Sequence, residues 1–286
     1  MTSLCVRGPM LHPRLLVLTR PSGVIQLGWD PESARQLAIP GLDADTVLRF
    51  LDLLDGLRTR PQIIWRAHEL GLTARRANEL LALLDDADLL VYPDTPAVRV
   101  HRVRVHGLGP LTDALAAGLR RFGLRPVRSR GARLDLRQRP DLVLLTDTLM
   151  PDPRLIDQLL RERIPHLPVR LRDGLGVVGP MVLPGQTSCL RCADLLRADY
   201  DPDWPRLAAQ LLGRVGHGSR SGIDATAALA LREVESIIAC SVRRPPAVLD
   251  AQLELDLDSY RLGLRRWAPH ARCVCRRIPA VIDAAT

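Results

Sequence analysis

The stretch that decides the fold is Gly179-Pro180-Met181-Val182-Leu183-Pro184-Gly185-Gln186-Thr187-Ser188-Cys189-Leu190-Arg191-Cys192, which ends in a Cys-x-x-Cys pair. A second close pair, Cys273 and Cys275, follows much later in the chain. Two such pairs can supply the four thiolates of a tetrahedral zinc site, which leaves no open position for water or substrate. We therefore predict a structural Zn²⁺ that is held by Cys189, Cys192, Cys273 and Cys275 and joins two distant parts of the chain.

Other uses of the cysteine pairs stay open. Disulfides would need an oxidising compartment, and the first residues show no secretory signal. A redox Cys-x-x-Cys belongs at the start of a helix in a thioredoxin-like unit, and it would leave the second pair unexplained. Cys5 and Cys240 are interpreted as an unliganded thiol and a small core residue. His270, close to Cys273, is a conceivable fifth ligand.

The composition is typical of one large or two smaller globular domains with an aliphatic core. The chain has 286 residues, of which 47% are hydrophobic and only 3% aromatic. No apolar run is long enough to span a membrane, so we predict a cytoplasmic protein without membrane association. The formal net charge is +8, and all 40 basic residues are arginines. This balance permits nucleic acid, nucleotide or acidic peptide partners, although a solvated surface that mixes arginines with acids is the simpler interpretation.

Residues 1–95 show the element order of a winged-helix domain. Apolar runs at 15–18 and 24–27 flank a Pro-Ser-Gly turn and predict a hairpin, and residues 35–39 predict a third extended segment. Three helical patterns and a strand at 89–92 follow. The helices are expected from Asp43 or Asp45 to Gly56, from Pro61 to Gly71 and from a cap at Thr73.

The domain at 1–95 can bind peptide, bind DNA or serve only as structure. Arg75 and Arg76 open the helix that a DNA-binding winged helix would place in the major groove. The same helix continues into Glu79 and a run of aspartates, which a phosphate backbone would repel. Winged helices also dock peptides as an added strand. We favour peptide or protein docking over a structural role and over DNA.

Residues 96–286 show an alternating α/β pattern that begins as a degenerate nucleotide-binding unit. A strand pattern at 98–105 leads into Gly107-Leu108-Gly109 and a helix from Thr112. Thr112 stands at the third glycine position, and Pro110 removes one amide that could face a phosphate. A second strand is expected at 124–127, and it is followed by arginines where a dinucleotide fold has a ribose-binding acid.

The clearest buried strand is 141–147, and Asp147 ends it. The carboxyl edge of a parallel sheet is where ligands bind, so Asp147 can hold Mg²⁺ or can cap a helix or turn. Further elements are expected along the rest of the chain. They are a helix at 153–163, a strand at 169–171, a polar excursion at 193–205, helices at 207–212 and 225–240, and a hairpin of strands at 248–257 and 259–267.

These motifs resemble the ThiF/MoeB-type fold of ubiquitin-activating enzymes. The similarity rests on the Gly-x-Gly start, on Leu-Leu-Thr-Asp-Thr at 144–148, on the 179–192 stretch and on the second cysteine pair. A winged helix before such a domain looks like the leader-peptide-binding cyclodehydratase partner proteins, which act beside YcaO enzymes in azole-peptide biosynthesis. The resemblance implies a leader peptide that pairs with the segment containing Gln36, Leu37 and Ala38 and lies against the helix that carries Arg76. It also implies a homodimer.

For the activity, the resemblance implies adenylation of a peptide carboxylate with MgATP. Gly107 and Gly109 match part of the family's nucleotide loop, and Asp147 matches its Mg²⁺-holding aspartate. The catalytic lysine has no counterpart because the chain contains no lysine, and an arginine is not equivalent there. Our hypothesis is a non-catalytic or weakly catalytic ThiF-like zinc protein that presents a peptide to a partner modifying enzyme. The alternatives are an active ATP-dependent adenylyltransferase and a winged-helix DNA-binding regulator, nucleic acid being the less favoured partner.

Overall fold

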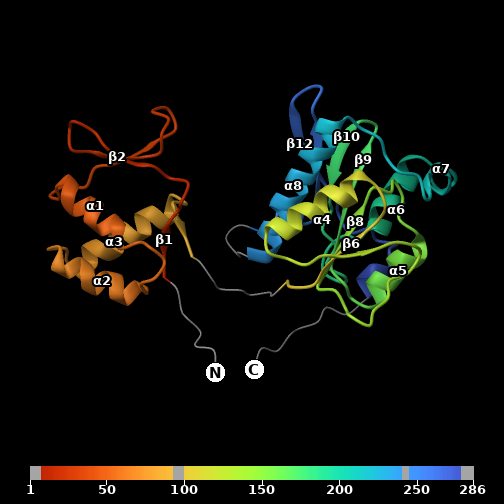
Figure 1. The fold of residues 1–286 in the computed structure, drawn as a ribbon, viewed down its shortest axis with the longest axis horizontal. Helices are drawn as coiled ribbons and strands as arrows, with labels where there is room; N and C mark the ends of the chain where they lie inside the picture. Colours follow the sequence, from red (N-terminus) through yellow and green to blue (C-terminus); the bar gives the residue numbers. More distant parts are fainter. Residues whose placement is uncertain (1–7, 93–99, 240–244, 278–286) are drawn as a thin grey trace. The chain divides into compact units, whose positions relative to one another are not determined.

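Figure 1 shows the computed structural model of the chain, which describes residues 8–92, 100–239 and 245–277. The chain divides into two compact units, residues 1–95 and 96–286. Cys5 and Cys240 lie outside the described residues, so their predicted roles stay predictions.

The first unit combines short strands with three helices. Strands β2 (Val17–Thr19), β3 (Ile25–Leu27) and β4 (Arg35–Leu37) form an antiparallel sheet in chain order. Strand β1 (Met10–Leu11) pairs antiparallel with β5 (Leu90–Val91). The helices are α1 (Ala44–Asp52), α2 (Arg60–Glu69) and α3 (Ala74–Asp86). The predicted hairpin, third extended segment and three helices are therefore present, and the winged-helix assignment stays a prediction.

Local capping explains where the helices of the first unit begin. The Asp43 side chain accepts the Thr46 amide at 2.8 Å, and the Thr73 side chain accepts the Arg76 amide at 3.3 Å. Both contacts satisfy amides that have no partner inside their helix. The apolar positions at helical spacing then form the core of the unit with the inner residues of β3. That core includes Ile25, Leu27, Val47, Phe50, Ile63, Ala67, Leu80 and Leu84.

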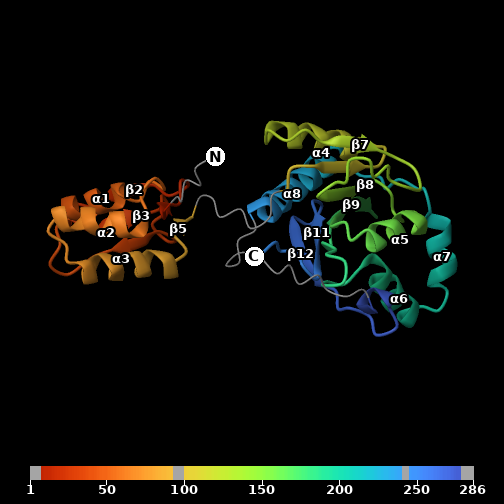
Figure 2. The ribbon, with the colours of Figure 1, turned by 90° about the horizontal axis from the view of Figure 1, so that it is seen from below.

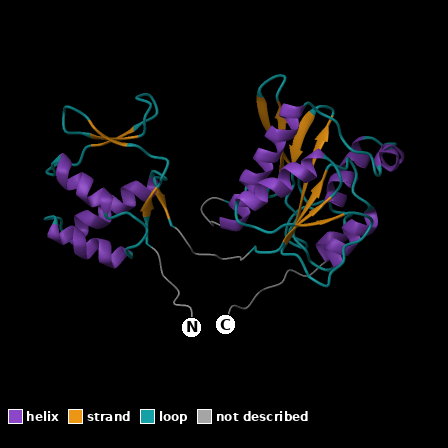
Figure 3. Ribbon diagram, viewed as in Figure 1, coloured by secondary structure: helices purple, strands orange, loops and turns teal. Residues whose placement is uncertain are grey.

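The second unit is built on a seven-stranded mixed sheet (Figure 3). The strand order is β12-β11-β10-β9-β8-β6-β7, in which β7, β6, β8 and β9 are parallel and β10 to β12 are antiparallel. The strands are β6 (Val103–His106), β7 (Val127–Ser129), β8 (Leu142–Thr146), β9 (His166–Arg172), β10 (Leu175–Val178), β11 (Ala251–Asp256) and β12 (Arg261–Arg266). The helices are α4 (Pro110–Arg121), α5 (Pro153–Arg161), α6 (Leu190–Tyr200), α7 (Trp204–Leu211) and α8 (Arg220–Ala239).

Helices cover both faces of this sheet. Figure 2 shows α4 and α8 on one side of the strands and α5 and α6 on the other. Along β8 the side chains alternate, so Leu142 and Leu144 pack in the core with α4 and α8, whereas Val143 and Leu145 pack in the core with α5 and α6. All four are buried. A buried strand with helices on both faces explains why residues 142–145 are continuously apolar.

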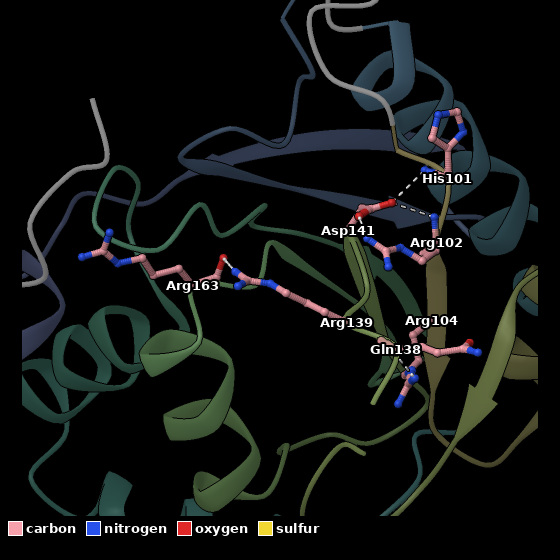
Figure 4. Close-up of polar contacts among 7 residues, drawn as sticks. All are labelled: His101, Arg102, Arg104, Gln138, Arg139, Asp141 and Arg163. Atoms are coloured by element: carbon pink, nitrogen blue, oxygen red, sulfur yellow. Dashed lines mark hydrogen bonds and ion pairs between the residues drawn. The ribbon is translucent and has the colours of Figure 1, made fainter. Parts of the chain in front are cut away.

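The strand predicted at 98–105 begins later than expected, at Val103. The Asp141 carboxylate accepts the His101 and Arg102 amides at 2.9 and 2.8 Å, so these amides bond to a side chain rather than to a neighbouring strand (Figure 4). Nearby, Arg139 donates to the Glu162 carbonyl at 2.6 Å, at the carboxyl end of α5, where a cation is favourable. These contacts hold the segment before β8 against β6 and α5.

Other boundaries also differ from the sequence prediction. The second strand lies at 127–129 rather than 124–127, because the Leu124 amide bonds to the Leu119 carbonyl and completes the end of α4. The expected polar excursion at 193–205 is mostly the helix α6, whose leucines and alanines favour helix. The predicted C-terminal hairpin is confirmed as β11 and β12.

Among the described residues, no helix combines the length and the apolar character that a bilayer crossing needs.

Candidate functional site

Four cysteines from distant parts of the second unit converge in one buried cluster. Cys189 is the residue before α6, and Cys192 lies in its first turn. Cys273 and Cys275 lie at a short 3₁₀-helix, Val274–Arg277. The four sulfur atoms all lie within 4.8 Å of one another, and each residue is buried. The predicted meeting of the two pairs is therefore present.

The geometry of the cluster fits a tetrahedral metal ion. The Cys189 sulfur lies 3.8 Å from that of Cys192 and 3.6 Å from that of Cys273, and the Cys192 and Cys275 sulfurs are 3.4 Å apart. Sulfurs at about 2.3 Å from Zn²⁺ in a tetrahedron would be about 3.8 Å apart, whereas a disulfide would bring two of them to about 2.05 Å. Four thiolates are ligands that zinc favours. The cluster can therefore hold a metal and contains no disulfide.

Side chains outside the cluster fix the second cysteine pair against α6. Asp199 on α6 accepts from His270 Nε2 at 2.7 Å and also pairs with Arg272. The imidazole of His270 is thus bound to a carboxylate and does not join the sulfur cluster as a fifth ligand. Burial raises the pKa of the Cys275 thiol to about 12, so metal binding there would have to displace a proton.

The carboxyl ends of β6 and β8 form the second candidate site. The chain leaves β6 toward β7 on one side, and β8 lies on the other side, so this is the point where the strand order reverses. In open α/β sheets, ligands bind at this point. A cavity of about 420 Å³ lies there. It is lined by His106, Gly107, Leu108, Arg130, Gly131, Leu145 and Thr148, among others.

Asp147 does not face this cavity as a free carboxylate. Its oxygens accept the Leu111 amide at 3.0 Å, the Thr112 amide at 3.0 Å and the Thr112 hydroxyl at 2.6 Å. Asp147 is only 1% exposed. It therefore caps the start of α4, the same helix end where a nucleotide-binding fold places a phosphate. The sequence predicted that Asp147 holds Mg²⁺ or caps a helix or turn. In the structure it is a cap, and the element that it caps is α4 rather than the turn that follows Asp147.

The Gly-x-Gly turn is shaped by this carboxylate. A Cβ atom at Gly109 would lie 2.5 Å from an Asp147 oxygen, and one at Gly107 would lie 2.2 Å from the Thr146 hydroxyl. Both glycines are thus required for close contact with residues 146 and 147. The space that the two glycines leave open is thus occupied by the side chains of Thr146 and Asp147.

The position of a ribose-binding acid holds a paired arginine. Arg128 on β7 forms an ion pair with Asp113 on α4 at 2.6 Å. Beside it, the His106 ring bonds to the Ser129 hydroxyl and the Gly131 carbonyl, each at 2.9 Å, and burial lowers its pKa. The side chains around this end of β6 are thus bonded to each other.

The predicted peptide-docking residues lie at one edge of the first unit. β4 pairs with β3 and with no other described strand, so its outer backbone edge is free. Gln36 and Ala38 are exposed, whereas Leu37 is buried in the core of the unit. Arg76 donates to the Pro40 carbonyl just after β4, which brings α3 next to this edge.

Comparisons with solved structures find chains with a similar fold. A heterocyclase in complex with substrate and cofactor matches with a TM-score of 0.63 at 16% identity, over 93% of this chain and 39% of that chain. The heterocyclase TruD matches with a TM-score of 0.58 at 16% identity, over 93% of this chain and 42% of that chain. E. coli MccB with AMPCPP and MccA matches with a TM-score of 0.59 at 12% identity, over 94% of this chain and 99% of that chain.

At these identities the likeness establishes the fold and nothing further. The chain spans about two fifths of the length of the two heterocyclases, but nearly the whole of MccB. No protein-family model matches the sequence, and no curated protein matches it.

Proposed function

We propose that the chain is a ThiF-like zinc protein, non-catalytic or weakly catalytic, that binds a peptide or protein substrate and presents it to a partner modifying enzyme. The observation that carries the proposal is the buried Asp147 cap at the start of α4. A carboxylate that is bonded to two amides and a hydroxyl places negative charge where a nucleotide's phosphates would need donors. The absence of lysine supports the same conclusion.

Peptide binding is assigned to the first unit, as a winged-helix dock. The free edge of β4, with Gln36 and Ala38 exposed, offers backbone donors and acceptors to an added strand. The arginines of the candidate recognition helix are already engaged, because Arg75 pairs with Glu79 at 2.9 Å and Arg76 bonds to Pro40. These contacts favour a peptide over a DNA backbone as the partner.

The solved structures support a setting in peptide modification. One match is a heterocyclase with its substrate, and another is MccB with MccA. We infer that the peptide belongs to an azole-forming pathway, that the metal is Zn²⁺, and that the protein acts in the cytoplasm as a homodimer.

Peptides selected from a displayed library on the full, zinc-loaded chain test the docking site. A photo-crosslinking residue at position 36, on β4, is expected to capture the selected peptides. The same residue at position 66, exposed on α2, serves as the matched control. Capture at position 66 but not at position 36 would contradict docking on β4.

The cavity at the carboxyl ends of β6 and β8 favours one second candidate, an ATP-dependent adenylyltransferase. Arg130 lines this cavity and would be the cation nearest to a bound phosphate. ATP–pyrophosphate exchange that depends on added peptide and is lost in Arg130→Ala would establish this candidate in place of the first.

A further inference from the structure

A buried arginine in the second unit has no direct partner. Arg170 lies on β9 and is 8% exposed. Within the described ranges it forms no hydrogen bond or ion pair, although the charges of Asp194 and Glu254 act on it. Burial lowers its pKa to about 10, which leaves it protonated at neutral pH. A buried charge without a hydrogen-bonded partner is unfavourable, and such groups gather at functional sites.

The strands around Arg170 place more polar groups on the same face. In the register, Arg170 and Glu254 both pair with Val177, so the three residues form a row across β9, β10 and β11. Glu254 is already engaged, because it accepts from Arg172 at 2.8 Å and from the Gln252 amide nitrogen. Gln252 is fully buried, and its amide oxygen has no partner. Glu254 therefore does not neutralise Arg170 by direct contact, and the Gln252 amide carries no charge.

Helix α6 supplies a second arginine that is held rigidly. Arg197 donates to Asp194 at 2.9 Å. Its guanidinium carbon lies 5.1 Å from the centre of the Trp204 ring and 4.9 Å from that of Trp267. Two aromatic faces and one carboxylate thus fix the guanidinium before any ligand arrives.

These groups line a small cavity next to a larger apolar cavity, and the two together are called the chamber. A cavity of about 20 Å³ is lined by Arg170, Arg197, Asp194 and Gln252, together with apolar residues. It shares Met150, Pro151, Leu190 and Asp194 with a second cavity of about 510 Å³. The lining of the larger cavity is mainly apolar and includes Ile156, Leu195, Trp204, Ala208 and Leu212. Its size is in the range of small-molecule sites.

We propose that this chamber binds a monocarboxylate that carries an apolar tail. The tail lies in the larger cavity between α5, α6 and α7, and the carboxylate reaches Arg170. A guanidinium matches a carboxylate with two parallel hydrogen bonds. The small cavity is lined by two guanidiniums and by the single carboxylate of Asp194, which leaves one positive charge for one negative charge on the ligand. The proposal does not depend on peptide docking by the first unit.

A free medium-chain acid and the C-terminus of an apolar peptide share this chemistry. The test titrates octanoate, octanol and octylamine into the full zinc-loaded chain and measures binding by isothermal titration calorimetry. Octanoate is expected to bind at least about 10-fold more tightly than octanol, because a charge-assisted hydrogen bond contributes that much. A short peptide that ends in leucine is then titrated as the free acid and as the C-terminal amide. If the free-acid peptide binds more tightly than the amide, the natural ligand is a peptide C-terminus. If octanoate binds and neither peptide does, the natural ligand is a free medium-chain acid.

Two variants separate the head from the tail of the ligand. Arg170→Met is expected to abolish the preference for octanoate over octanol, and Ala208→Trp, which fills the larger cavity from α7, is expected to weaken both. Equal binding of octanol and octanoate by the unmodified chain would overturn the proposal, and this comparison needs no variant to fold. Unchanged octanoate binding by Arg170→Met, or no binding of any of the probes at millimolar concentration, would overturn it as well.

Discussion

Replacement of Asp147 by alanine tests the cap on α4 most sharply. The substitution removes the acceptor of two backbone amides and one hydroxyl. The Thr112 hydroxyl keeps its contact with the Thr146 hydroxyl at 2.6 Å. The Leu111 and Thr112 amides, however, belong to fully buried residues and lose this acceptor. The helix start would then carry two unsatisfied donors.

The expected loss follows from those donors. Each buried amide without a partner costs about 1 to 3 kcal/mol, so the two together cost about 2 to 6 kcal/mol. A water that enters the vacated space would restore part of this energy. Alanine also tolerates the backbone of Asp147, with φ of 67°, less well than aspartate does. We expect Asp147→Ala to lower the free energy of unfolding of the second unit by about 3 kcal/mol.

The assay is hydrogen-exchange mass spectrometry of the full chain across a urea series, with peptides from α4 and β8 reporting on the second unit. Asp152→Ala is the matched control, because Asp152 caps α5 through one amide, that of Arg154 at 2.8 Å, at a more exposed place. The control should lose only about 1 kcal/mol. An Asp147→Ala loss equal to or below that of the control would refute the cap. Such a result would favour a free, ligand-binding carboxylate.

Three further outcomes are expected. Cys192→Ser should release one Zn²⁺ equivalent and unfold the second unit while the first stays folded, as metal analysis and hydrogen exchange would show; a metal-free chain with both units folded contradicts this. Gly109→Ala should lower stability by about 2 kcal/mol or more, because its Cβ would lie 2.5 Å from an Asp147 oxygen; unchanged urea unfolding contradicts it. Burial lowers the pKa of His166 to about 4, so the unfolded chain binds the extra proton and stability falls as pH drops from about 6.5 toward 4. His166→Gln should reduce that slope by up to about 1.4 kcal/mol per pH unit, and an identical slope in both proteins would contradict the assignment.

The predictions that succeeded used signals local in sequence. The caps at Asp43 and Thr73 precede periodic apolar residues, and the structure contains both. The two cysteine pairs have the spacing of metal ligands, because a short stretch of backbone keeps the two sulfurs of each pair close, and the structure brings the two pairs together. The hairpin of β11 and β12 follows from two strand patterns joined by a short turn.

The features that the sequence could not settle depend on contacts between distant residues. Asp147 is 36 positions from Leu111, so only the folded sheet shows that it caps α4. The late start of β6 has the same kind of cause, because Asp141 takes the amides of His101 and Arg102. Arg170 stands in a strand pattern that also contains Arg172, and no sequence signal indicates which of the two is buried without a partner.

Calorimetric titration of MgATP into the zinc-loaded full chain tests the central claim most directly. If Asp147 caps α4 and the protein presents a peptide to a partner enzyme, no binding heat is expected up to millimolar nucleotide. Saturable binding in the micromolar range would contradict that account, and loss of that binding in Arg130→Ala would place the nucleotide in the cavity beside Gly107 and Arg130.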